Sequence, residues 1–123
     1  MNRVKLENLT VHQLVERFVA IALDQDKAML EHDNATYNRL YGLMDGVRQE
    51  LTRRPGDQRR ALIPLHDHPN AQVRLKSAIA TLALAPEAAR RTLQTISDQQ
   101  EYPQAADARG MMMAVDEGTF VPS

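Results

Sequence analysis

The chain has 123 residues, a formal net charge of −1 and 43% hydrophobic residues, values typical of one globular domain. It has no cysteine, which excludes disulfides and thiolate metal sites. No stretch approaches the roughly 18 apolar residues of a membrane span, and the start, MNRVKLENLT, lacks the apolar core of a signal peptide. We therefore expect a single domain over residues 1–123, located in the cytoplasm.

The first half of the chain predicts two long helices. Thr10 followed by Gln13 fits a capping box, and apolar residues then recur at helical spacing over residues 11–31. Asp33 provides a turn and cap signal before a second amphipathic segment, residues 35–53. Because the link between them is short, the two helices should form an antiparallel hairpin.

The second half predicts four shorter helices separated by turn signals. Pro55-Gly56 is a clear break in the chain, and Pro86 suits the first position of a helix. Gly118 suits the position just after a helix. The expected helices of this half are residues 58–66, 71–84, 86–97 and 103–117.

The helix expected over residues 71–84 is the centre of the predicted core. Asn70 can cap its start, because its side chain can accept a bond from a free first-turn N–H. Most of its surface is apolar, which is typical of a helix buried against several neighbours. We expect Leu75, Ile79 and Leu82 to be buried. The polar positions form one narrow stripe of Arg74, Ser77 and Thr81.

This part of the chain also resembles one HEAT repeat. The matching residues are Leu62-Ile63-Pro64-Leu65, Asp67, Pro69, Val73-Arg74 and the small residues Ser77, Ala78 and Ala80. In that family two antiparallel helices pack as a unit and the units stack into a solenoid. The resemblance implies a structural role for Asp67 and Arg74. The whole chain is similar to a bacterial family of small helical-repeat proteins of unknown function, which implies a fold and no function.

No segment shows the sustained alternation of apolar and polar residues that predicts a strand. Together with the resemblance, this gives the expected fold. We expect an all-α protein, a short HEAT-like α-α superhelix of about six helices in antiparallel pairs.

The cluster most similar to a metal site is His66-Asp67-His68, because imidazole and carboxylate are ordinary zinc or iron ligands. No remote third ligand is marked, so we expect no metal and no other cofactor. The chain has no phosphate-binding glycine loop, nucleophile elbow or HExxH motif. We therefore expect no catalytic residue. The alternative is an enzyme or small-ligand binder with a pocket between helix pairs, which a deep polar pocket holding a histidine or carboxylate would favour.

Charge is concentrated in the middle of the sequence, where residues 48–76 carry seven basic and three acidic residues. Arg53-Arg54 and Arg59-Arg60 flank one turn, so we expect four exposed guanidinium groups at one edge. Such an edge would steer an acidic protein partner, and reversing Arg53 and Arg59 should leave folding nearly intact.

The pair Arg90-Arg91 could likewise contact phosphates or carboxylates. Nucleic-acid binding through the arginine-rich segment is a further alternative. The low aromatic content of 4% disfavours it, because single-strand readers usually supply stacking aromatic rings.

Met111-Met112-Met113 forms a soft apolar run near the end of the chain. It could fill the core, or it could be the contact of a homodimer, because methionine surfaces adapt to their partners. On all these grounds we expect a non-enzymatic protein–protein interaction module, of the adaptor or immunity type.

Overall fold

The structure is a computed structural model that describes residues 5–123. Within these residues every regular element is a helix and no strand is present, which confirms the predicted all-α class. None of the helices in this range is long and apolar enough to cross a membrane. The chain divides into two compact units, Met1–Ala61 and Leu62–Ser123, and each is described by itself. The single domain expected from the sequence stays a prediction.

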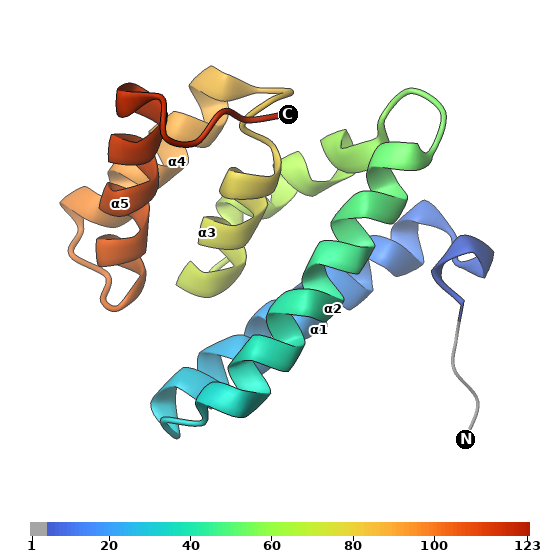
Figure 1. Cartoon of the computed structure of the whole chain (residues 1–123), viewed down its shortest axis with the longest axis horizontal. Coiled ribbons are helices and arrows are strands. Elements are labelled where there is room, and N and C mark those ends of the chain that lie inside the picture. The colour runs from blue at the N-terminus through green and yellow to red at the C-terminus, as the bar shows by residue number, and fades with distance from the viewer. Residues whose placement is uncertain (1–4) are drawn as a thin grey trace. The chain divides into compact units, whose positions relative to one another are not determined.

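The first unit is a helical hairpin. A short 3-10 helix, η1 (Leu6–Asn8), precedes α1 (Val11–Leu30) and α2 (Asn34–Arg53). The two long helices run side by side in opposite directions, as predicted (Figure 1). The capping box at the start of α1 is confirmed: Thr10 Oγ1 accepts from the Gln13 N–H at 3.0 Å, and Gln13 Oε1 accepts from the Thr10 N–H at 2.9 Å.

Each helix of the hairpin has one buried apolar stripe, at the spacing that amphipathic helices require. The large buried apolar side chains are Leu14, Phe18 and Ile21 on α1, and Leu40, Met44, Val47 and Leu51 on α2. Asp33 begins α2 by accepting a bond from the Thr36 N–H at 3.1 Å. The helix positions in this unit therefore agree closely with the sequence prediction.

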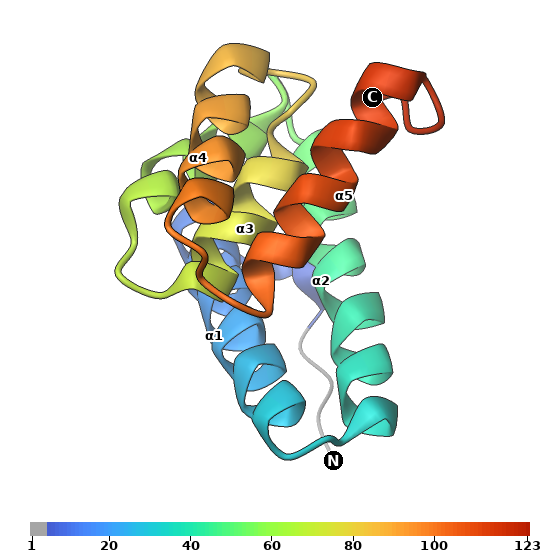
Figure 2. The same ribbon diagram turned by 90° about the vertical axis from the view of Figure 1, so that its left-hand side faces the viewer.

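The second unit contains three α-helices, α3 (Ala71–Ala80), α4 (Pro86–Asp98) and α5 (Gln104–Glu117). α3 packs against α4, and α4 packs against α5 (Figure 2). Asn70 caps α3, since its Oδ1 accepts from the N–H groups of Gln72 at 2.8 Å and Val73 at 3.1 Å. The predicted cap of this helix is confirmed.

Two predicted helices differ in detail from the structure. Residues Gln58–Asp67 are helical, as predicted for residues 58–66, but this helix, η2, is of the 3-10 type. Pro64 explains the difference, because it has no N–H for an α-helical bond and its ring crowds the preceding turn. The helix predicted for residues 71–84 ends at Ala80, and turns follow to Leu84. There the Thr81 hydroxyl donates to the Ser77 carbonyl at 2.8 Å, a local bond that competes with helix continuation.

The core of the second unit joins all three α-helices. Its buried members are Leu75, Ala78, Leu82, Ala89, Leu93, Ile96, Ala105, Ala108 and Met112. Leu75 and Leu82 are buried as predicted, but Ile79 is only partly buried at the margin of this core. Conversely, Ser77 and Thr81, predicted to lie on a polar stripe, are fully buried, and the bonds of both hydroxyls to backbone carbonyls of α3 offset the cost of that burial.

These burials predict an order of stabilities. Leu75→Ala should lower the free energy of unfolding by about 2–5 kcal/mol, because it leaves a cavity at a fully buried site. Ile79→Ala should cost less, because its side chain is already partly in water. Urea denaturation followed by circular dichroism measures both. An equal or larger loss for Ile79→Ala would contradict the placement of Leu75 at the centre.

Candidate functional site

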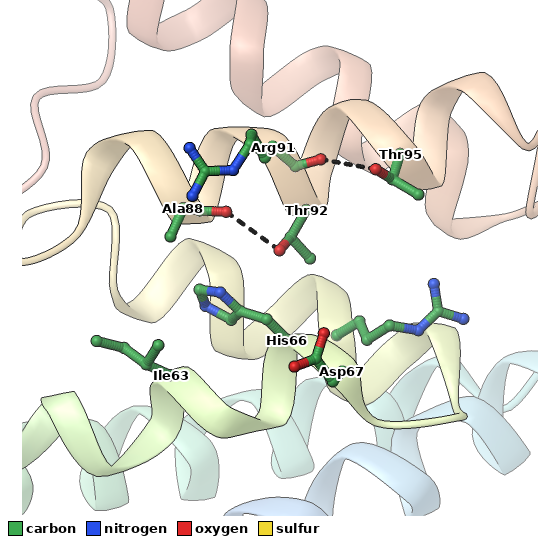
Figure 3. A pocket seen from close by; sticks show the side chains of 8 residues that line it. Ile63, His66, Asp67, Ala88, Arg91, Thr92 and Thr95 are labelled. Atoms are coloured by element: carbon green, nitrogen blue, oxygen red, sulfur yellow. Dashed lines mark hydrogen bonds between the residues drawn. The ribbon is translucent and has the colours of Figure 1, made fainter.

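A polar pocket of about 470 Å³ lies between the C-terminal part of η2 and α4, within the second unit. Its volume falls in the range of small-molecule sites. Figure 3 shows its two walls, with His66 and Asp67 on η2 facing the α4 side. The lining residues are Ile63, His66 and Asp67 from η2, Arg74 from α3, and Ala88, Arg91, Thr92 and Thr95 from α4.

His66 is held in one orientation by a buried hydroxyl. Its Nε2 lies 2.9 Å from Thr81 Oγ1, and that hydroxyl gives its own proton to the Ser77 carbonyl. The Nε2–H of His66 therefore donates to Thr81, which leaves Nδ1 as the acceptor of the neutral ring. Burial lowers the pKa of His66 below its usual value of 6.5, although the Ser77 carbonyl and the Asp67 charge oppose the shift. The ring is thus a neutral acceptor near pH 7.

Two side chains of opposite charge in this pocket have no partner within residues 5–123. The guanidinium of Arg91 and the carboxylate of Asp67 are both exposed, and neither forms an ion pair or side-chain hydrogen bond there. Nearby, the hydroxyls of Thr92 and Thr95 donate to the carbonyls of Ala88 and Arg91, at 3.2 and 2.9 Å (Figure 3). Both hydroxyl oxygens keep lone pairs that can accept a bond from a ligand.

Arg74 occupies a different position, because all its strong bonds are internal. Its guanidinium makes two bonds to the Glu101 carboxylate, at 2.7 and 2.8 Å, and Nε donates to the His68 carbonyl at 2.7 Å. It therefore ties the turn before α3 to the link between α4 and α5. This is the kind of structural role that the HEAT resemblance implies for Arg74. Asp67 makes no such tie among the described residues.

The two histidines of His66-Asp67-His68 bond to different partners. Whereas His66 bonds to Thr81, His68 Nδ1 accepts from the Asn70 N–H at 3.0 Å. In the described part of the chain, no group of three or more histidine, aspartate or glutamate side chains could hold a metal ion. The expectation that His66 and His68 bind no metal stays a prediction.

The arginines of the predicted partner edge are largely engaged within the first unit. Arg53 and Arg54 both donate to Glu50, at 2.8 and 2.7 Å, and Arg54 also donates to the carbonyls of Leu6 and Leu9. Bonds from Arg54 and then Arg53 hold the pKa of Glu50 below its usual range. One carboxylate thus binds two arginines at the end of α2 and neutralises one of their two charges.

In the second pair, Arg59-Arg60, one side chain is buried and the other is exposed. The Arg59 side chain is only 5% exposed and donates to Asp57 at 2.6 Å, whereas Arg60 is exposed and donates to the Gly56 carbonyl at 3.0 Å. The expectation that all four guanidinium groups are exposed is therefore wrong for Arg59. Partner binding stays a prediction, and it now rests on the exposed Arg53 and Arg60.

The three methionines also separate. Met112 is buried in the core of the second unit, Met111 is partly buried against it, and Met113 is 59% exposed. Both interpretations of the run therefore apply, each to a different residue. The homodimer contact stays a prediction that rests on Met113.

In the sequence His66 and Asp67 form one local cluster, but nothing there groups them with Arg91. Helical periodicity indicates the α4 part of this pocket, because Ala88, Arg91, Thr92 and Thr95 are spaced to share one face of a helix. The approach of that face to η2 depends on how α3 packs, and no local pattern predicts it.

The fold and the pocket define a small all-α protein built from packed helix pairs. Residues 12–116 match the family described as a domain of unknown function, DUF2019, and the chain belongs to this family. Its structure is similar to the crystal structure of the protein RPA1889 from Rhodopseudomonas palustris CGA009, with a TM-score of 0.94 and 41% sequence identity. The alignment covers 98% of this chain and 100% of that chain. No match is found among curated proteins.

Charge reversal at the buried arginine should destabilise the protein. Arg59→Glu places a second carboxylate beside Asp57, so it should lower the free energy of unfolding by at least about 2 kcal/mol, given about 3–5 for breaking a buried pair. Arg60→Glu is the matched control at an exposed site and should stay within about 0.5 kcal/mol of the wild type. Equal denaturation midpoints for the two variants would contradict the structural role of Arg59.

The Arg74–Glu101 pair predicts a pH dependence. Its bonds lower the pKa of Glu101 below the ordinary value of 4.5, so the unfolded chain takes up the proton first as the pH falls. The stabilising contribution of this pair is complete above the ordinary, unfolded-state pKa of Glu101. It is lost as the pH falls through the lower pKa of the folded state. The unfolding free energies of wild type and Glu101→Gln should therefore converge below about pH 4.5. A pH-independent difference, measured by urea titration, would argue against the pair.

Proposed function

We propose that the protein is a non-enzymatic protein-binding module and that α1 provides its binding surface. The observation that supports this best is the exposure of Leu30, at 76%, and Leu23, at 42%, on the same helix. They are seven residues apart, or about two helical turns, and therefore point to the same side of α1. Half-buried Val19 lies one turn before Leu23 and extends the apolar stripe.

This stripe is separate from the stripe that holds the hairpin together. At 100° per residue, Leu23 and Leu30 lie on the side of α1 opposite to buried Leu14 and Phe18. Exposed apolar side chains grouped on one helix face are typical of surfaces that receive a partner. Burying a leucine completely contributes about 1.5–3 kcal/mol, so two leucines can support a specific contact.

The charges around the stripe favour a basic partner. Over residues 11–31 the sequence has four acidic residues, Glu16, Asp24, Asp26 and Glu31, against Arg17 and Lys27. An amphipathic helix with a leucine stripe and flanking lysines or arginines would complement this surface in shape and in charge. An adaptor or an immunity-type protein would use such a helix-on-helix contact.

The acidic partner expected from the arginine-rich segment is a separate proposal. Arg53 keeps a 64% exposed side chain although it donates to Glu50, and Arg60 is exposed. Each could meet a carboxylate of a partner. The engagement of Arg54 and Arg59 in internal bonds reduces the positive field of this edge, which is why we favour the face of α1.

Two synthetic helical peptides test the proposal, both with a leucine stripe, one flanked by lysines and the other by glutamates. Fluorescence anisotropy should show tighter binding of the lysine peptide. The double variant Leu23→Ser/Leu30→Ser should weaken that binding at least tenfold, because two apolar contacts are removed.

Val121→Ser is the matched control, because Val121 is 75% exposed, nearly the same as Leu30, and lies in the second unit. It should bind the lysine peptide as the wild type does. Equal affinities for the two peptides would exclude a role for the acidic flanks. Unchanged binding in the double variant would show that α1 is not the surface used.

A further inference from the structure

We propose that the pocket between η2 and α4 binds a small zwitterion, an α-amino acid with an aliphatic side chain. This inference goes beyond the protein-binding function, because it concerns the second unit and a different set of residues. It rests on the placement of unpartnered groups of opposite charge, a neutral histidine acceptor and apolar side chains around one volume.

The carboxylate end of the ligand would bind Arg91. Within residues 5–123 this guanidinium has no internal partner, in contrast to its sequence neighbour Arg90, which makes two bonds of 2.7 Å to Asp116. The planar guanidinium offers a fork of N–H donors that matches a carboxylate. The pocket thus contains a carboxylate-binding group that folding has left available.

The ammonium end would bind acceptors on the η2 side. Asp67 supplies a carboxylate that makes no ion pair in the described part of the chain. His66 supplies Nδ1, since its Nε2–H is held by Thr81. The lone pairs of the Thr92 hydroxyl can accept a third N–H. An ammonium group has three donors, and these three groups can satisfy them.

Charge balance favours a zwitterion over a simple ion. The Arg74 charge is neutralised by Glu101, so Arg91 and Asp67 are the charges that remain for a ligand. A simple anion would be attracted by Arg91 but repelled by Asp67. A simple cation would be attracted by Asp67 but repelled by Arg91. Ile63 and Ala88 add apolar surface against which an aliphatic side chain can pack.

Three probes of the same carbon skeleton test this inference. L-Valine has both charged groups, isovalerate lacks the amine, and isobutylamine lacks the carboxylate. Titrations at millimolar concentration, followed by amide chemical shifts in ¹H–¹⁵N NMR spectra, should show valine binding with shifts at η2 and α4. Isovalerate and isobutylamine should bind at least tenfold more weakly. Absence of valine binding, or equal binding of isovalerate, would overturn the proposal.

Matched variants locate the site. Arg91→Ala and Asp67→Asn should each weaken valine binding at least tenfold while the denaturation midpoint stays unchanged, because neither side chain has an internal partner within residues 5–123. Arg90→Ala removes the same charge one residue away, outside the pocket lining, and should bind valine normally. Equal losses in Arg90→Ala and Arg91→Ala would show a general charge effect and refute the site.

Discussion

The second unit depends on the bonds of one guanidinium group. Arg74 is on α3, but it bonds to the His68 carbonyl before that helix and to the Glu101 carboxylate after α4. It therefore fixes the turn that follows η2 relative to the helices that pack on α3. The Arg74 side chain is only 15% exposed, where solvent screens an ion pair less than at the surface. The position of Asp67 and His66 beside α4 follows from this restraint.

A second restraint acts at the end of α3. The Thr81 hydroxyl bonds to the Ser77 carbonyl and receives the His66 Nε2–H, so one buried hydroxyl both ends a helix and orients a ring. Buried polar groups are stable only when they are hydrogen-bonded, and this chain of bonds satisfies them. This chain of bonds also explains why the side of the pocket that contains His66 is well defined, although the mouth of the pocket is polar and open to solvent.

Ion pairs within the chain decide which charged side chains remain available to a partner. Glu50 and Asp57 engage three of the four arginines near the end of α2, and Glu101 and Asp116 engage Arg74 and Arg90. The basic character of residues 48–76 is therefore weaker at the surface than in the sequence. Arg91 differs from these arginines because no acidic side chain of the described residues pairs with it. The apolar residues Leu23 and Leu30, left exposed on α1, form a further surface that remains available to a partner.

The sequence by itself determined the helical class, the hairpin of α1 and α2, and the caps at Thr10, Asp33 and Asn70, because these depend on residues within one or two turns of each other. It also located Leu75 and Leu82 in the core. Tertiary structure alone decided that Ile79 lies at the core margin and that Arg59 is buried while Arg60 is exposed. Tertiary structure also decided the pocket, since His66 and Arg91 are 25 residues apart in the chain. Burial and pairing depend on which distant residues approach, and a local pattern carries no information about that approach.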